Sequence, residues 1–168
     1  SICYEANQAF YIPLEHLERT ELKKDLVLKK LKTILEDASI KKVGQNIKYD
    51  FIIFKNHGIE LTSLDDTMLL SYTLDAGNNR HNMDTLSELH LGHKTISYKE
   101  IVGTGKKQLN FSEVDLKSAT EYAAEDADVT LRLYELLSER VSNENLEKIY
   151  EIFEKPMIKI LSLSLIHI

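Results

Sequence analysis

The sequence contains a single cysteine, Cys3, so no disulfide can form within the chain. One free thiol is compatible with a reducing compartment but does not require one. The sequence also has no cluster of cysteines and histidines, which argues against a zinc site. No stretch holds the roughly 20 consecutive apolar residues that a membrane-spanning helix needs. Internal disulfides, a zinc centre and a membrane span are therefore not expected.

Positive charge is in deficit, because 21 basic residues face 27 acidic ones and the net charge is −6. The molecule as a whole therefore does not attract phosphate. Any contact with nucleic acid has to rely on local basic patches or on bound cations. This charge argues against a pure DNA-binding module and leaves a metal-dependent nuclease open. At 168 residues, the chain suits one domain with a substantial core.

Alternating strand and helix patterns indicate an α/β domain with a mixed sheet. Two short strands are expected at 1–5 and 9–13, followed by an amphipathic helix over 21–37. Further strands are predicted at 41–44 and 61–65. Further helices are predicted over 47–56, 66–74, 83–91, 97–102, 115–141 and 143–160. Loops are predicted at 76–82 and, with two lysines, at 103–108.

Several of these helices have recognisable start and stop residues. Asn46 stands at the N-cap position of the helix over 47–56, and Gly58 stands where that helix should stop. Ser112 or Asp115 is expected to cap the long helix over 115–141. Pro156 should interrupt the last helix.

The long helix contains the stretch Tyr-Ala-Ala-Glu-Asp-Ala-Asp-Val-Thr at 122–130. Tyr122 and Asp126 are four residues apart and share one helix face. A phenol and a carboxylate so placed can hold a water molecule and a divalent cation side by side. The same spacing also suits a half-buried tyrosine beside a solvated acid.

Asp50 follows Gly-Gln-Asn-Ile-Lys-Tyr at 44–49 and should lie in the first turn of its helix. An acid there interacts favourably with the helix dipole, which is one explanation for it. Alternatively, Asp50 is a metal ligand, with Gln45, Asn46 and Lys48 around it as contacts for a phosphate backbone.

Four blocks in a fixed order form a more specific pattern: Gly-Gln-Asn-Ile-Lys-Tyr-Asp (44–50), Leu-Asp-Asp-Thr-Met-Leu (64–69), Arg-His-Asn-Met-Asp-Thr-Leu (80–86) and the stretch at 122–130. Together they resemble the 3′–5′ exonuclease (proofreading) domain of bacterial DNA polymerase I, a family-A polymerase. The resemblance runs from about residue 1 to residue 162. It implies a ribonuclease-H-like exonuclease fold, in which a mixed sheet is flanked by helices and the first strand is missing here.

The resemblance also implies which residues act. Asp50 matches the aspartate of the family's second acidic motif, and Tyr122 and Asp126 match the third. Four carboxylates in that family bind two divalent metals, Mg²⁺ or Mn²⁺, and Asp50 and Asp126 would be two of the four. Oxygen ligands suit these hard cations. Tyr122 would orient the attacking water, because an unperturbed phenol stays protonated at neutral pH.

Contacts to nucleic acid are implied for Gln45, Asn46, Tyr49, Arg80 and Tyr98. Tyr98 matches a position that can stack a frayed base, although it can equally pack under the loop at 103–108. Arg80 matches a position near the DNA strand end and can equally be an ordinary surface arginine. Asn46 can serve as a simple helix cap.

The chain departs from the family pattern at the first acidic motif, because no Asp-x-Glu occurs in it. In the family this motif lies on a strand just before the point where this chain begins. We therefore expect that sequence is missing upstream of Ser1. Two of four metal ligands would then be absent, and the fragment should bind metal poorly and be nearly inactive.

Three regions are expected: the exonuclease domain at 1–142, a helix leading toward a polymerase domain at 143–162, and a non-native tail at 163–168. The expected partners are the single-stranded or frayed 3′ end of DNA and a polymerase domain in the same full-length chain. A monomeric protein of the bacterial cytoplasm is expected. Two alternatives remain: a catalytically silent structural domain of such a polymerase, or a related RNA-trimming 3′–5′ exonuclease.

Overall fold

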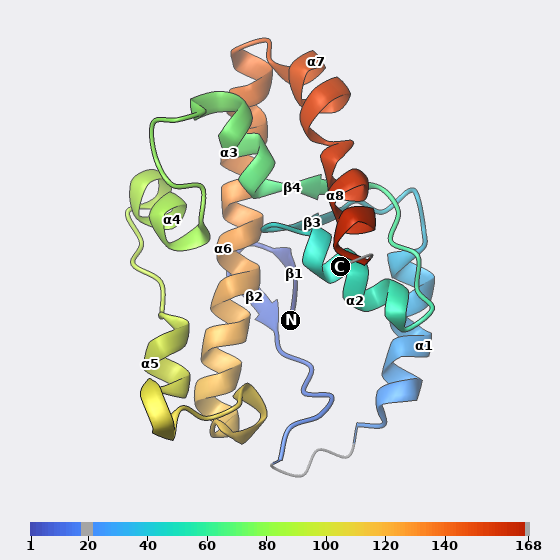
Figure 1. Ribbon diagram of the computed structural model, residues 1–168, viewed down its shortest axis with the longest axis vertical. Coiled ribbons are helices and arrows are strands. Elements are labelled where there is room, and N and C mark those ends of the chain that lie inside the picture. Colours follow the sequence, from blue (N-terminus) through green and yellow to red (C-terminus); the bar gives the residue numbers. More distant parts are fainter. Residues whose placement is uncertain (18–21, 167–168) are drawn as a thin grey trace.

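One long helix, α6 (Leu116–Asn143), runs through the middle of the molecule, with the strands and shorter helices around it (Figure 1). The computed structural model describes residues 1–17 and 22–166, the last three of these by their backbone alone. Asp115 caps α6 by accepting the Ser118 backbone N–H at 2.9 Å, as the sequence predicted. The buried side chains of α6 recur along one face: Ala119, Ala123, Val129, Leu133, Leu137 and Val141.

The strands form two pairs of opposite kinds. β1 (Ile2–Glu5) and β2 (Gln8–Phe10) are antiparallel, whereas β3 (Lys42–Gly44) and β4 (Leu64–Asp66) are parallel. β1, β2 and β3 all pack against α6. The predicted α/β class with strands in both orientations is confirmed. Within the described ranges, however, the two pairs are separate sheets rather than one continuous one.

In Figure 1, α4 and α5 lie on one side of α6 and α1 and α2 on the other, while α3 overlaps the upper part of α6 and packs against it. Their bounds are α1 (Lys24–Leu35), α2 (Lys48–Asn56), α3 (Thr67–Asp75), α4 (Met83–Leu91) and α5 (Tyr98–Val102). The predicted helix over 83–91 coincides with α4. Glu21, the predicted start of the first helix, lies outside the described residues. Two short 3₁₀ turns, η1 (Gly105–Lys107) and η2 (Phe111–Glu113), lie between α5 and α6.

The start of α2 differs from the prediction. Asn46 is not the cap: the helix begins after Ile47, and Asn46 has a φ of 60°, in the left-handed region. The Asp66 carboxylate instead accepts the backbone N–H groups of Asn46 and Ile47, at 2.9 and 3.0 Å. The backbone of residue 44 passes close to the Ile47 side chain. Glycine allows this, because a Cβ on residue 44 would lie 2.8 Å from Ile47 Cγ1. Gly58, with a φ of 70°, follows the end of α2 as predicted.

The C-terminal segment also differs from the single interrupted helix expected over 143–160. Asn145 adopts a φ of 58° just after α6 and so ends it. The chain then forms α7 (Glu147–Ile149), the π-helical turn η3 (Tyr150–Glu154) and α8 (Met157–Ile166). The expected break at Pro156 lies between η3 and α8. The proposed non-native tail continues α8 as far as 166, and its last two residues lie outside the described part.

In the described part of the chain, three clusters of buried side chains hold these elements together, and the smallest consists of Val102, Val114 and Ala119. The first joins α3, α4 and α6 to Tyr150 of η3. The second joins α2, β4 and the loop before β4 to α8, through Ile47, Phe51, Ile59, Leu61, Leu64 and Ile158. In the described part of the chain, no helix combines the length and the apolar character that crossing a membrane demands.

Candidate active site

Tyr122 and Asp126 lie one turn apart on α6, and the Tyr122 hydroxyl and the Asp126 carboxylate each affect the pKa of the other. Burial raises the pKa of Asp126 to about 6, outweighing the opposite effect of the Tyr122 hydroxyl. Burial and the neighbouring Asp126 also raise the pKa of Tyr122 above its usual value. One oxygen, Asp126 Oδ1, is buried and accepts no hydrogen bond. That oxygen is available to a water molecule or a cation.

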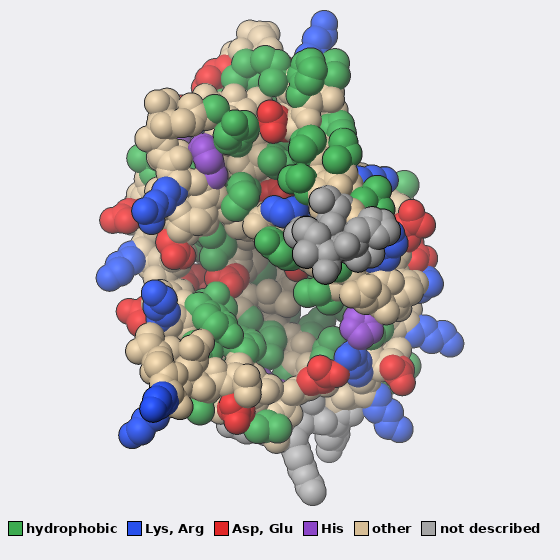
Figure 2. Space-filling view, in the orientation of Figure 1, with side chains coloured by type: hydrophobic (Ala, Val, Ile, Leu, Met, Phe, Trp, Pro, Cys, Tyr) green, Lys and Arg blue, Asp and Glu red, His purple; other side chains and the backbone are tan. Residues whose placement is uncertain are grey.

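Asp50 lies in the first turn of α2, as the sequence predicted. Its side chain keeps contact with solvent, yet the surrounding protein displaces enough water to raise its pKa. The Ser1 amino group interacts electrostatically with both Asp50 and Asp126. The two acids, 76 positions apart in the printed sequence, therefore both lie within electrostatic range of the start of β1. The face of the molecule drawn in Figure 2 is hollowed between α6 and α2.

Three aromatic rings pack together beside the Tyr122/Asp126 pair. The ring centroids of Tyr98 and Phe111 are 6.2 Å apart, and each lies within 5.9 Å of the Tyr122 ring. Tyr98 keeps 45% of its surface exposed. Tyr98 thus supports Tyr122 on one side and retains a solvent-facing surface on which a base can stack.

Two acids near Asp126 were not assigned a role from the sequence. Asp84 and Glu125 both raise the pKa of Asp126 by like-charge repulsion. The Glu125 carboxylate contacts His93 Nε2 at 2.8 Å and accepts the Ile96 N–H at 2.6 Å. Asp84 accepts the Thr95 hydroxyl at 2.8 Å. Glu125 stands directly before Asp126 and Asp84 lies within the third block of the family pattern, so adjacency to known motifs was the available signal.

The other residues predicted to contact nucleic acid differ in whether their side chains are hydrogen-bonded within the protein. Gln45 is used within the protein, because its amide donates to the His81 carbonyl at 2.7 Å and accepts from the Thr67 hydroxyl. The Asn46 side chain accepts from the Lys48 ammonium.

Tyr49 and Arg80 are exposed, and the Lys48 ammonium lies 5.0 Å from the centre of the Tyr49 ring. Tyr49 and Arg80 are therefore open to a ligand. Gln45 and Asn46 instead shape the start of α2.

The chain offers part of a metal site. Carboxylate oxygens are the ligands that Mg²⁺ and Mn²⁺ prefer, and the unpartnered Asp126 Oδ1 suits such a cation. Across the described ranges, however, no three or more His, Cys, Asp or Glu side chains are grouped closely enough to hold a metal ion. Asp50 and Asp126 are consistent with half of a carboxylate ligand set, and their binding of metal stays a prediction.

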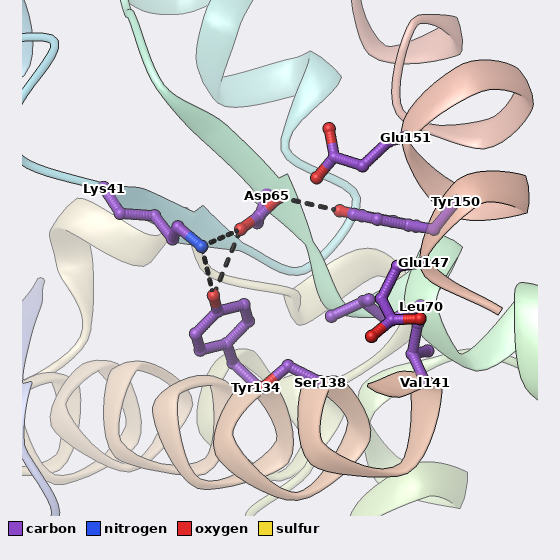
Figure 3. A pocket seen from close by; sticks show the side chains of 9 residues that line it. All are labelled: Lys41, Asp65, Leu70, Tyr134, Ser138, Val141, Glu147, Tyr150 and Glu151. Atoms are coloured by element: carbon purple, nitrogen blue, oxygen red, sulfur yellow. Dashed lines mark hydrogen bonds and ion pairs between the residues drawn. The ribbon is translucent and has the colours of Figure 1, made fainter. Parts of the chain in front are cut away.

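A second polar cluster surrounds Asp65, in a hollow of about 160 Å³ (Figure 3). The buried Asp65 carboxylate meets the Lys41 and Lys155 ammonium groups at 2.8 and 2.9 Å. It also accepts the hydroxyls of Tyr134 and Tyr150, each at 3.1 Å. Burial raises the pKa of Asp65, but the two lysines outweigh it and the pKa lies below its ordinary value. All four donors converge on one acid, so this cluster acts as an internal brace.

Comparisons with known proteins show the family to which the chain belongs. A protein-family model described as 3′–5′ exonuclease matches residues 1–142. DNA polymerase I of Rhizobium leguminosarum is 46% identical over 166 residues, covering 92% of this chain and 16% of that protein. DNA polymerase I of Pseudomonas aeruginosa is 39% identical over 169 residues, covering 96% of this chain and 18% of that protein. The chain thus spans less than a fifth of the length of these relatives.

The solved structure of Brucella melitensis NrnC superposes with a TM-score of 0.62 at 22% identity. The match covers 80% of this chain and 64% of that one, which supports the ribonuclease-H-like exonuclease fold expected from the sequence. Together with the family match over residues 1–142, these similarities assign the chain to the 3′–5′ exonuclease domain family of DNA polymerase I.

Proposed function

We propose that this chain is the proofreading part of a DNA polymerase I and serves to hydrolyse the last phosphodiester at a single-stranded or frayed 3′ end of DNA. One observation supports this most. Tyr122 and Asp126 lie a helical turn apart on α6, and the buried Asp126 Oδ1 accepts no hydrogen bond from the protein. A buried carboxylate oxygen that accepts no hydrogen bond is costly unless a ligand completes it.

In this proposal Asp50 and Asp126 hold divalent cations, Mg²⁺ or Mn²⁺. Bound cations of this kind polarise phosphate oxygens and increase the acidity of water. Tyr122 orients the attacking water, and its raised pKa keeps the phenol protonated at neutral pH. An Asp-x-Glu motif upstream of Ser1 in the parent chain supplies the other two carboxylates.

The substrate end lies across α5, α6 and α2. Tyr98 stacks a base on its exposed side, while Tyr49 and Arg80 meet the sugar-phosphate backbone. Gln45 and Asn46 act indirectly, by fixing the start of α2. Residues 143–162 lead toward the polymerase domain of the same chain, and 163–168 are a non-native tail.

The test compares this chain with a longer protein that carries the upstream strand and the Asp-x-Glu motif. Both are incubated with single-stranded DNA labelled at the 5′ end, with Mg²⁺ or with a chelator. We expect the longer protein to shorten the DNA stepwise from the 3′ end only with Mg²⁺. Its Asp126→Asn and Asp50→Asn variants should lose at least about 100-fold in rate, by analogy with losing one transition-state stabilising group. The 168-residue chain should be nearly inactive.

Asp128→Asn is the matched control, because Asp128 lies two residues further along α6 and contacts Asn7 and Arg132 instead. This variant should keep its activity. Robust Mg²⁺-dependent degradation by the 168-residue chain alone would contradict the proposed ligand set. An inactive longer protein would favour the catalytically silent domain instead.

A further inference from the structure

We propose that the segment after residue 142 is a positioning element of the candidate site: Tyr150 and Ile158 hold the first turn of α2, and with it Asp50. This segment lies beyond the residues that match the exonuclease family. Its effect on chemistry rests on the proposed function. Its effect on the position of α2 rests on contacts alone.

The first contact is made by the hydroxyl of Tyr150, a buried residue of the C-terminal segment whose side chain points toward β4 (Figure 3). It accepts the backbone N–H of Asp66 at 3.0 Å and donates to the Asp65 carboxylate at 3.1 Å. The Tyr150 side chain thus bonds the backbone of Asp66 and the side chain of Asp65, two consecutive residues of β4. This arrangement fixes the end of the strand, because both the donor and the acceptor capacity of the hydroxyl are used.

Asp66 passes this constraint to α2. Its carboxylate accepts the N–H groups of Asn46 and Ile47, the two residues that precede α2, and also that of Met68. Asp66 is 2% exposed, so no water competes for these bonds. Asp50 follows Asn46 by four residues and lies in the first turn of α2. A shift of the Asp66 backbone therefore moves the start of the helix that carries Asp50.

The second contact is apolar and independent of the first. Ile158 of α8 is 2% exposed and packs in one cluster with Ile47 and Phe51 of the α2 region. Phe51 directly follows Asp50 in the chain. The hydrogen bonds of the N–H groups before α2 and the packing of its first turns therefore both depend on residues after 142.

Tyr134 provides a matched control for Tyr150. Its hydroxyl also donates to Asp65, at 3.1 Å, but the Asp66 N–H bonds Tyr150 and not Tyr134. The variants Tyr150→Phe and Tyr134→Phe each remove one phenol oxygen from the same buried acid. Only Tyr150→Phe also deprives the Asp66 N–H of its acceptor.

The experiment measures amide hydrogen exchange and ¹⁵N chemical shifts in the 168-residue chain. In Tyr150→Phe we expect the Asn46 and Ile47 amides to exchange about three- to tenfold faster than in the wild type, the effect of weakening about one hydrogen bond. Their shifts should move, while amides in the middle of α6 keep their rates. Tyr134→Phe should leave Asn46 and Ile47 unchanged. Equal effects of the two variants, or none in Tyr150→Phe, would overturn the proposal.

A second pair of variants tests the apolar contact without a large loss of packing. Ile158→Val trims a buried side chain, whereas Ile160→Val trims one on the same helix that is 55% exposed. We expect the Phe51 amide to shift in the first and not in the second, and identical spectra near α2 would overturn this step. The readouts need no catalysis. An inactive longer protein with these shifts refutes only the proposed function, whereas an active one without them refutes only this inference.

Discussion

At Asp126, burial and the Tyr122 hydroxyl act on the pKa in opposite directions, and burial prevails with a pKa of about 6. The folded chain therefore binds this proton more tightly than the unfolded chain, whose aspartates titrate near their ordinary value of 3.8. Such a group favours folding at low pH, and its contribution is lost as the pH rises from about 4 through about 6. The site thus gives up stability at neutral pH to keep an ionised, unpartnered oxygen.

This predicts that Asp126→Asn is more stable than the wild type at pH 7, by about 1–3 kcal/mol without added metal. The difference should shrink toward zero near pH 4, where the wild-type carboxyl is protonated in both states. Urea unfolding at pH 4, 5, 6 and 7 in a chelator measures it. Asp128→Asn is the control: Asp128 accepts the Asn7 N–H and pairs with Arg132, so its loss should lower stability. A destabilised Asp126→Asn at pH 7 would contradict the assignment.

At the scale of the element, α6 serves the core and the site at once. Its N-terminal half, the lower one in Figure 1, carries Tyr122 and Asp126. Its C-terminal half, the upper one, carries the apolar face that packs on α3 and α4. Leu133 is fully buried in that face. Because the helix is continuous, the packing of its upper half also fixes the direction in which the lower half points.

Truncation of Leu133 to alanine should therefore lower the free energy of unfolding by about 2–5 kcal/mol, through lost burial and a residual cavity. Leu89→Ala on α4 is the control, because Leu89 is 58% exposed and its loss should change stability by no more than about 0.5 kcal/mol. Urea titration of both variants gives the comparison. Similar losses in the two would show that the upper half of α6 is not part of the core.

Elements governed by neighbouring residues were predictable from the sequence. α4 and α6 were placed nearly to the residue, since apolar spacing and the Asp115 cap are local signals. The Asn46 cap of α2 was predicted wrongly, because the N–H groups before this helix bond Asp66, which lies 20 positions after Asn46 in the chain. A break between the helix over 115–141 and the next one was predicted, and a left-handed Asn145 produces it. The π-helical turn η3 before Pro156 was missed, because no local residue pattern marks it.

The candidate site divides in the same way. The pairing of Tyr122 with Asp126 follows from helix geometry, four residues apart. That Asp50 and Asp126 both lie near Ser1 could be expected only from the resemblance to a family, because tertiary packing, and not local sequence, places α2 relative to α6. Glu125 and Asp84 were missed, because their partners His93, Ile96 and Thr95 lie in a loop with no periodic pattern.

At the scale of the whole molecule, a net charge of −6 opposes the approach of DNA, so bound cations have to offset it locally. In the proposed function, four carboxylates gather around these cations, and without them the acids repel one another. Metal binding to the folded state alone stabilises it by mass action, about 2.7 kcal/mol at a free concentration 100 times the Kd. Folding of the complete domain should therefore be coupled to metal.

The prediction is that Mn²⁺ raises the melting temperature of the longer protein, the one with the upstream Asp-x-Glu strand, by about 5–10 °C at such saturation. The 168-residue chain should gain much less, because two carboxylates bind the ion weakly. Differential scanning calorimetry with increasing Mn²⁺ measures both. Asp50→Asn and Asp126→Asn in the longer protein should remove most of the gain, whereas Asp128→Asn should retain it. An equal gain in the short and the longer protein would mean that the cation binds elsewhere, and that Asp50 and Asp126 are not half of a shared ligand set.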